Sequence, residues 1–228
     1  MLKLPKISIL SGITVDGKLN LRKNFSSKYF DKFLPKAVFE PQNFYRKNSD
    51  AIMVGSQTVK IDNPKLISNE NPFLKRIIIS RKLNIPINYK IFKIKPENTI
   101  IITTLSSFLK KDKYCKKLKK RGVTFLVYKS NRLNFKKILI DLKKKFKINK
   151  ILVEGGGKLN YILLKEKLVS EVQVILFPFI VGNKNSTSFV EGGGFLKNFK
   201  HGICKLKLKK IKKIAYNFLY IKYEVQYN

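Results

Sequence analysis

Short apolar runs alternate with amphipathic stretches along the first two thirds of the chain. Most of the runs end on glycine or on a polar residue, which is typical of strands buried on both faces of a sheet. They cover Ile7–Ile13, Asp50–Gly55, Arg76–Ser80, Thr99–Thr103, Gly122–Tyr128 and Lys150–Glu154. Apolar residues at three- and four-residue spacing predict helices over Phe108–Lys120, Leu133–Phe146 and Leu159–Leu168. This alternation predicts an α/β fold with a mostly parallel sheet.

Two other regions follow different patterns. Ser26–Asn48 has apolar residues at mixed helical spacings and is broken by Pro35 and Pro41, which predicts short helices. The last third changes character and predicts antiparallel strands, because its runs are apolar, strictly alternating, or rich in aromatic and β-branched residues. These runs are Glu171–Val181, Cys204–Leu208 and Phe218–Val225. Without an internal repeat or a composition break, we expect one domain over residues 1–228.

Composition supports a globular protein. The chain has 228 residues, 44% of them hydrophobic, which is enough to bury a core. The longest apolar run, Val172–Val181, is about half the roughly 20 residues that a membrane-spanning helix needs. Cys115 and Cys204 lack metal-ligand spacing and His201 is the only histidine, so we expect neither a metal site nor a catalytic triad. These features indicate a cytoplasmic protein.

The net charge of +35 is the least ordinary feature of the composition. Such a charge attracts phosphate-bearing molecules, and a lysine-driven nucleic-acid-binding protein is one alternative. However, 43 of the 49 basic residues are lysine, whereas proteins that read bases rely on arginine. We interpret the lysines as solvated surface that reflects an AT-rich coding bias and helps to gather anionic substrates. We do not expect nucleic acid as a partner.

The strongest chemical signal is the sequence Val153–Asn160, in which three glycines separate a predicted strand from a predicted helix. Glycines let the backbone approach a pyrophosphate closely, and the amides at a helix N-terminus favour its charge. Glycine turns also end strands for purely steric reasons. The motif therefore predicts a dinucleotide clamp only in combination with others, and it lacks the GxGxxG pattern of Rossmann folds.

A second motif, Met53–Pro64, places small polar side chains and a carboxylate after a strand that ends on Gly55. Ligands bind at such strand ends in α/β proteins. The same motif is explained equally well without a ligand, if Thr58 caps a helix and Asn63–Pro64 forms a turn.

The motifs occur in one characteristic order. Taken together they resemble the reductase domain of the riboflavin-biosynthesis deaminase/reductase and the stand-alone pyrimidine reductases of archaea and fungi. The matching segments are Thr14–Lys18, Asp50–Gly55 with Thr58–Val59, Asp62–Pro64, Ile77–Pro86, Ile151–Asn160, Phe177–Gly182 and Phe189–Phe195. The resemblance covers nearly the whole chain.

The resemblance implies a dihydrofolate-reductase-like fold, a three-layer sandwich with a mostly parallel central sheet and antiparallel C-terminal strands, assembled as a homodimer. It also implies the reaction. A hydride passes from NADPH to the sugar C1 of a phosphoribosylamino-pyrimidine, which converts the ribosyl group into ribityl without a metal. A related oxidoreductase acting on another carbonyl or imine substrate is the alternative within this class.

The same resemblance assigns the site. Asp62 and Glu154 are the expected catalytic carboxylates, and a guanidinium at Arg81 beside Ser80 suits the 2′-phosphate of the cofactor. The residues expected to bind the cofactor are Gly12, Gly55, Thr58, Asp62, Ser80, Arg81, Gly155, Gly156, Gly157, Lys158, Leu159 and Asn160. Those expected on the substrate side are Thr14, Asp16, Arg46, Leu66 and Glu154.

The chain also departs from the family pattern. Asn69 stands where bacterial bifunctional enzymes carry an arginine for the substrate phosphate, and Leu10 replaces a polar residue. Recognition of the phosphate is therefore open, with Ser26–Lys28 as candidates. No segment corresponds to the zinc-containing deaminase domain, so the chain is expected to reduce its substrate without deaminating it.

Overall fold

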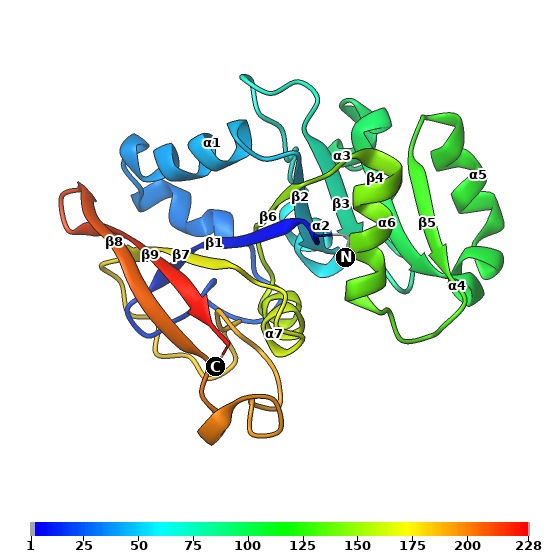
Figure 1. The fold of residues 1–228 in the computed structure, drawn as a ribbon. Helices are drawn as coiled ribbons and strands as arrows, with labels where there is room; N and C mark the ends of the chain where they lie inside the picture. Colours follow the sequence, from blue (N-terminus) through cyan, green and yellow to red (C-terminus); the bar gives the residue numbers. More distant parts are fainter. Residues whose placement is uncertain (1–2, 228) are drawn as a thin grey trace. The chain divides into compact units, whose positions relative to one another are not determined.

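The computed structural model describes residues 3–227 and divides them into two compact units. Unit 1 contains the described residues up to Pro5 together with Arg46–Ile151. Unit 2 contains Lys6–Tyr45 together with the described residues from Leu152 onward. The chain therefore passes from one unit to the other three times. Figure 1 shows the course of the chain through both.

Unit 1 is built on four parallel strands, β2 (Ala51–Gly55), β3 (Lys75–Ile79), β4 (Thr99–Thr104) and β5 (Thr124–Tyr128). They are hydrogen-bonded in the order β5-β4-β3-β2, with Val54 opposite Ile78 and Ile78 opposite Ile101. Isoleucine dominates β3 and β4, and its branched side chain suits a pleated surface covered on both faces. All four strands confirm the sequence expectation.

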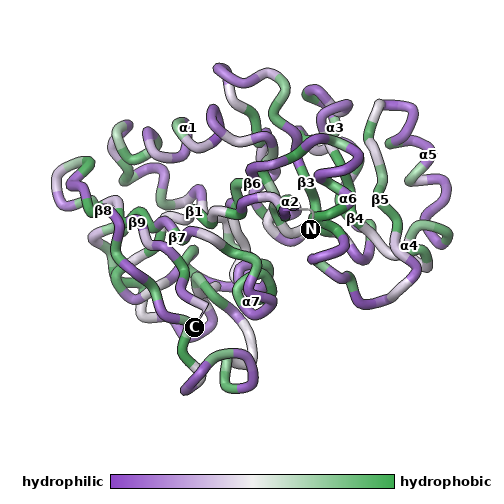
Figure 2. The backbone as a smooth tube through the Cα atoms, in the orientation of Figure 1, coloured by the Kyte–Doolittle hydropathy of each residue, from purple (hydrophilic) through white to green (hydrophobic). Residues whose placement is uncertain are grey.

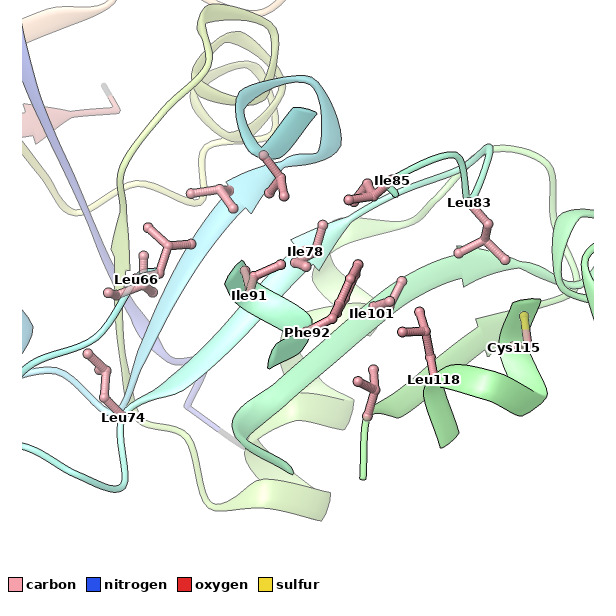
Figure 3. Packing of buried hydrophobic residues seen from close by; sticks show 14 residues of the cluster. Leu66, Leu74, Ile78, Leu83, Ile85, Ile91, Phe92, Ile101, Cys115 and Leu118 are labelled. Carbon is pink, nitrogen blue, oxygen red and sulfur yellow. The ribbon is translucent and has the colours of Figure 1, made fainter. Parts of the chain in front are cut away.

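Helices cover both faces of the unit 1 strands. They are α2 (Ser56–Asp62), α3 (Lys90–Lys93), the 3-10 turn η3 (Pro96–Asn98), α4 (Leu105–Lys110), α5 (Asp112–Lys120) and α6 (Phe135–Phe146). Figure 3 shows one buried face, where side chains of β3 and β4 meet those of α3 and α5. Figure 2 shows how strongly hydrophilic α5 is on its outer side. The single helix expected over Phe108–Lys120 is two helices, because the backbone leaves the helical conformation at Lys111.

Unit 2 contains β1 (Lys6–Thr14), β7 (Glu171–Phe177), β8 (Lys205–Ala215) and β9 (Phe218–Gln226). β1 pairs with β7 in parallel, whereas β7 with β9 and β8 with β9 are antiparallel. The strand β6 (Lys150–Val153) lies where the chain passes from unit 1 to unit 2. The expected mostly parallel arrangement with antiparallel C-terminal strands is confirmed.

Two strand boundaries differ from the expectation. β7 ends at Phe177 rather than Val181, since Pro178 cannot donate to the ladder. β8 is longer than Cys204–Leu208 and runs to Ala215. Its register shifts between Leu208 and Lys210, so the alternation of apolar and polar residues is interrupted in the sequence although the strand continues.

The other elements of unit 2 are η1 (Ser27–Phe33), η2 (Lys36–Phe39), α1 (Glu40–Lys47, of which Arg46 and Lys47 belong to unit 1), α7 (Gly157–Lys165) and η4 (Lys200–Gly202). The first three confirm the short helices expected in this region. A core forms where Phe30 and Val38 pack with Ile175, Phe177 and other buried side chains. Within residues 3–227, no helix combines the length and apolar character needed to cross a bilayer.

Candidate functional site

The residues assigned from the sequence fall into two sets, one in each unit. In unit 1, Gly55 ends β2 and Ser80 follows β3 directly. In unit 2, Thr14 ends β1 and Glu154 follows β6. All four therefore lie at carboxyl ends of strands, which is where ligands bind in sheets with parallel strands. The two sets are described in turn.

The glycine loop of unit 2 has the backbone geometry of an anion cradle. Gly155 has φ of +96°, a conformation that residues with a side chain rarely adopt, and a Cβ built there would meet nothing within 4 Å. Gly156 is the N-cap of α7, and among the described residues no side chain caps this helix. The first amides of α7 are thus left for another acceptor, as in helix N-termini that bind phosphate. The loop fits a pyrophosphate.

Gly157 has a different reason to be glycine. A Cβ at this position would lie 2.3 Å from the carbonyl oxygen of Ser188. The backbone amide of Glu191 donates to the Gly157 carbonyl at 3.0 Å, and the side-chain Nδ2 of Asn160 donates to Phe189 O at 2.9 Å. The segment after β7 therefore packs directly on the first turn of α7 and fixes its position. This contact was not visible in the sequence.

Glu154 lies half-buried immediately before the glycine loop. The Nε2 of Gln42, on α1, donates a hydrogen bond to its Oε2 at 3.1 Å. A residue more than a hundred positions earlier in the chain thus orients the carboxylate assigned to catalysis. The sequence analysis did not identify Gln42, because a lone glutamine in a helix has no recognisable signal.

Asp16 holds together the turn that follows β1. Its Oδ1 accepts a hydrogen bond from the Thr14 hydroxyl at 2.5 Å, and the amides of Val181 and Gly182 donate to the carboxylate at 3.2 and 2.8 Å. The Thr14 hydroxyl, followed by these backbone amides, lowers the pKa of Asp16 to about 2. Thr14 and Asp16 therefore have a structural role in unit 2, and their assignment to the substrate stays a prediction.

Gly12 lies against an aromatic ring. A Cβ added to it would come within 2.2 Å of Cζ of Phe177, which belongs to the adjacent strand β7. The absence of a side chain is thus required by packing within unit 2. The assignment of Gly12 to cofactor binding stays a prediction, because packing against Phe177 already explains why this residue is a glycine.

In unit 1, helix α2, which follows β2 directly, carries Thr58 and Asp62, both half-buried. Gly55 is the N-cap of α2, so the reading of Thr58 as a helix cap is wrong. Asn63 ends the helix in the left-handed conformation, with φ of 40°, and its Oδ1 accepts from the amide of Lys90 at 2.9 Å. Asn63 thus caps the C-terminal end of α2, where Asp62 lies.

Ser80 and Arg81 differ sharply in exposure. Ser80 is completely buried and its amide donates to Ile102 O at 2.9 Å, whereas Arg81 is exposed. The side chain of Ser80 therefore faces the interior of unit 1. The guanidinium of Arg81, by contrast, is available to bind a phosphate.

Arg46 and Leu66 also lie in unit 1. The Nη1 of Arg46 donates to Ile67 O at 3.3 Å, next to Leu66 in the sequence. Leu66 has φ of 50°, is only 4% exposed as a whole residue, and packs in the core that Figure 3 shows. Its assignment to the substrate stays a prediction. Asn69, at the position of the missing arginine, is exposed.

Comparisons with known proteins agree with this fold. A family model described as the RibD C-terminal domain matches residues 5–220. The 2,5-diamino-6-ribosylamino-4(3H)-pyrimidinone 5′-phosphate reductase of Aquifex aeolicus is 33% identical over 203 residues, which are 86% of this chain and 88% of that protein.

Two solved structures show the fold. RibD of Acinetobacter baumannii superposes with a TM-score of 0.80 at 20% identity over 98% of this chain and 58% of that chain. This chain thus spans little more than half of that RibD. Dihydrofolate reductase of Enterococcus faecalis, complexed with NADP(H), superposes with a TM-score of 0.51 at 10% identity. The expected dihydrofolate-reductase-like fold is confirmed, and the chain belongs to the RibD C-terminal domain family.

Proposed function

We propose that this protein is an NADPH-dependent reductase that converts the ribosyl group of a 6-ribosylamino-pyrimidine 5′-phosphate into a ribityl group, as a step of riboflavin biosynthesis. The observation that carries the proposal is the cradle in front of α7, with Gly155 open at positive φ and no side-chain cap among the described residues. It occurs in a chain that is 33% identical to a protein named a pyrimidinone 5′-phosphate reductase.

Backbone and side-chain groups of this protein would bind the cofactor and orient it. In unit 2, the amides of Gly157 and Lys158 would hold the cofactor pyrophosphate through the partial positive charge of the helix N-terminus. In unit 1, the exposed Arg81 would pair with the 2′-phosphate that distinguishes NADPH from NADH. NADPH supplies the hydride when bound.

Asp62 and Glu154 are proposed as the catalytic carboxylates. Each would accept hydrogen bonds from the substrate, and one would exchange the proton that the sugar oxygen takes up on reduction. Gln42 holds the Glu154 carboxylate in one orientation by its hydrogen bond to Oε2. The enzyme then acts mainly by placing the substrate against the cofactor, while the fold holds the two carboxylates in position.

The residues proposed for the substrate are Arg46 and Leu66 in unit 1, and Glu154, Thr14 and Asp16 in unit 2. A guanidinium suits a phosphate, and the net charge of +35 would raise the local concentration of anionic substrates. We also propose one reductase domain over residues 1–228. A homodimer, implied by the family resemblance, and a cytoplasmic location, indicated by the composition, stay predictions.

The direct test supplies the purified protein with two substrates, the 2,5-diamino-pyrimidinone and the 5-amino-uracil forms of the ribosylamino phosphate. We expect consumption of NADPH, followed by absorbance, and a ribityl product two mass units heavier than its substrate. Running both substrates shows whether reduction precedes or follows deamination. Failure to oxidise NADPH with either substrate would contradict the proposed function, and equal rates with NADH would contradict the cofactor preference.

A further inference from the structure

Arg76, on β3, is the largest side chain that the described residues bury completely, with 1% of its surface exposed. It lies on the strand between Lys75 and Ile77, and the sequence analysis gave it no function. Burying a charged guanidinium is unfavourable unless hydrogen bonds replace the water it has lost. The hydrogen-bond partners of Arg76 therefore indicate the role of this residue.

The guanidinium of Arg76 joins two segments through their backbone carbonyls. Its Nη1 donates to Lys65 O at 3.1 Å, and its Nη2 donates to Lys95 O. Burial lowers the pKa of Arg76 to about 10 while Glu97 opposes this change, so the group is charged at neutral pH. Both hydrogen bonds are therefore charge-assisted, which makes them stronger than bonds between neutral groups.

Each of these two carbonyl groups lies at or next to a residue with positive φ, a conformation that few residues other than glycine adopt. Leu66, which follows Lys65, has φ of 50°, and Lys95 itself has φ of 47°. Residues other than glycine persist in this region only when their surroundings hold them there. Leu66 is held by its side chain, which packs in the core with Leu74 and Ile78, and by Arg76 at the preceding carbonyl.

A second arginine holds the next part of the same segment. Arg46 Nη1 donates to Ile67 O at 3.3 Å, so Lys65–Ile67 is fixed at one end by Arg76 and at the other by Arg46. The segment lies in the irregular stretch that links Asp62 at the end of α2 with β3. Two of the residues proposed to touch the substrate, Arg46 and Leu66, thus meet at this segment.

We propose that Arg76 is a positioning residue for the substrate. By holding the Lys65 and Lys95 carbonyls, it fixes Lys65–Ile67, and with this segment the Ile67 carbonyl that accepts a hydrogen bond from Arg46. This inference rests on the proposed function, which assigns Arg46 and Leu66 to the substrate. Arg76 itself, being buried, does not touch the substrate.

The first test measures hydrogen exchange of the backbone amides and needs no substrate. In Arg76→Met the apolar chain fills similar space but leaves both carbonyls without a donor, and Arg76→Lys keeps the charge with a smaller head. We expect protection of the amides in residues 65–69 to fall about tenfold in Arg76→Met, with the α5 amides unchanged and Arg76→Lys intermediate. Unchanged protection of residues 65–69, or an equal loss throughout unit 1, would overturn the proposal.

The second test separates KM from kcat in Arg76→Lys, the milder variant. The KM for the pyrimidine phosphate should rise about tenfold, while kcat and the KM for NADPH stay within about threefold. The control is Tyr128→Phe, which removes the 2.8 Å hydrogen bond to Asp141 elsewhere in unit 1 and should leave the KM unchanged. An equal rise of KM in the control would show a general loss of stability and overturn the inference. A wild-type protein without turnover would contradict the proposed function alone, because the exchange experiment still tests Arg76.

Discussion

The Gln42 side chain donates a hydrogen bond to the Glu154 carboxylate across 3.1 Å, although the two residues are 112 positions apart in the chain. Gln42 lies on α1 and Glu154 lies between β6 and the glycine loop. A half-buried carboxylate that accepts a fixed amide is limited in the orientations it can take. The function proposed for Glu154 therefore depends on a residue in a distant part of the sequence.

We expect Gln42→Leu to lower kcat/KM by about tenfold, because losing a hydrogen bond to a charged group costs roughly 1.5–3 kcal/mol and removes a contact that orients the carboxylate. The control is Asn43→Leu, which makes a similar change at an exposed position of the same helix. Steady-state kinetics with saturating NADPH measure both variants. Equal activities of the two would show that Gln42 does not act through Glu154.

Gly155→Ala should weaken NADPH binding. Its φ of +96° strains any residue with a side chain, and the loop would relax away from the shape that fits a diphosphate. Gly194→Ala is a matched control, since Gly194 has φ of +78°, equally meets nothing within 4 Å, and lies outside the assigned site. Both variants should lose roughly 1–2 kcal/mol of stability. Fluorescence titration with NADPH should detect weaker binding in Gly155→Ala only.

Arg81→Ser should raise the dissociation constant for NADPH about tenfold or more and leave that for NADH unchanged, because only NADPH carries the 2′-phosphate. The neighbouring exposed Lys82→Ser removes the same charge and serves as the control. Calorimetry with both nucleotides gives the four values to compare. If the two variants weaken NADPH binding equally, general attraction by the basic surface explains the effect and Arg81 has no specific role.

Asp16 should make stability depend on acid pH. Its pKa lies at about 2, below the ordinary value of 3.8, mainly because of the hydrogen bond from Thr14. A lowered folded-state pKa stabilises the protein above the unfolded value, and this contribution is lost as the pH falls from about 4 to about 2. Asp16→Asn should therefore be less stable than the wild type at pH 7. The difference should shrink below pH 4, and it should be modest because the carboxylate is exposed.

Melting temperatures of both proteins between pH 2 and pH 7 test this prediction. A constant difference over the whole range would show that the Asp16 charge is not involved.

The two units should unfold together. The chain passes between them after Pro5, after Tyr45 and after Ile151, so neither unit is a continuous segment that can fold before the other is made. We expect a single cooperative transition, with the calorimetric and van't Hoff enthalpies of unfolding equal. Two resolved transitions would show that the units are separate domains and would contradict the single reductase domain over residues 1–228.

The sequence by itself determined most of the secondary structure and the class of fold. Runs such as Ile100–Ile102 and helices such as α6 are decided by hydrophobic periodicity, which acts over a few neighbouring residues. The glycine loop was equally visible, since three glycines between a strand and a helix are a local signal. The extent of β8 was not, because lysines and a register shift interrupt its alternation.

Tertiary structure alone decided how particular side chains are held. The bonds from Gln42 to Glu154 and from Arg76 to the Lys65 carbonyl join residues whose separation in sequence has no regular pattern. The contact of Gly157 with Ser188, which explains one glycine of the loop, is of the same kind. Local propensity depends on nearby residues, whereas these contacts depend on how distant segments pack, and no periodicity in the chain encodes which distant group fills a given space.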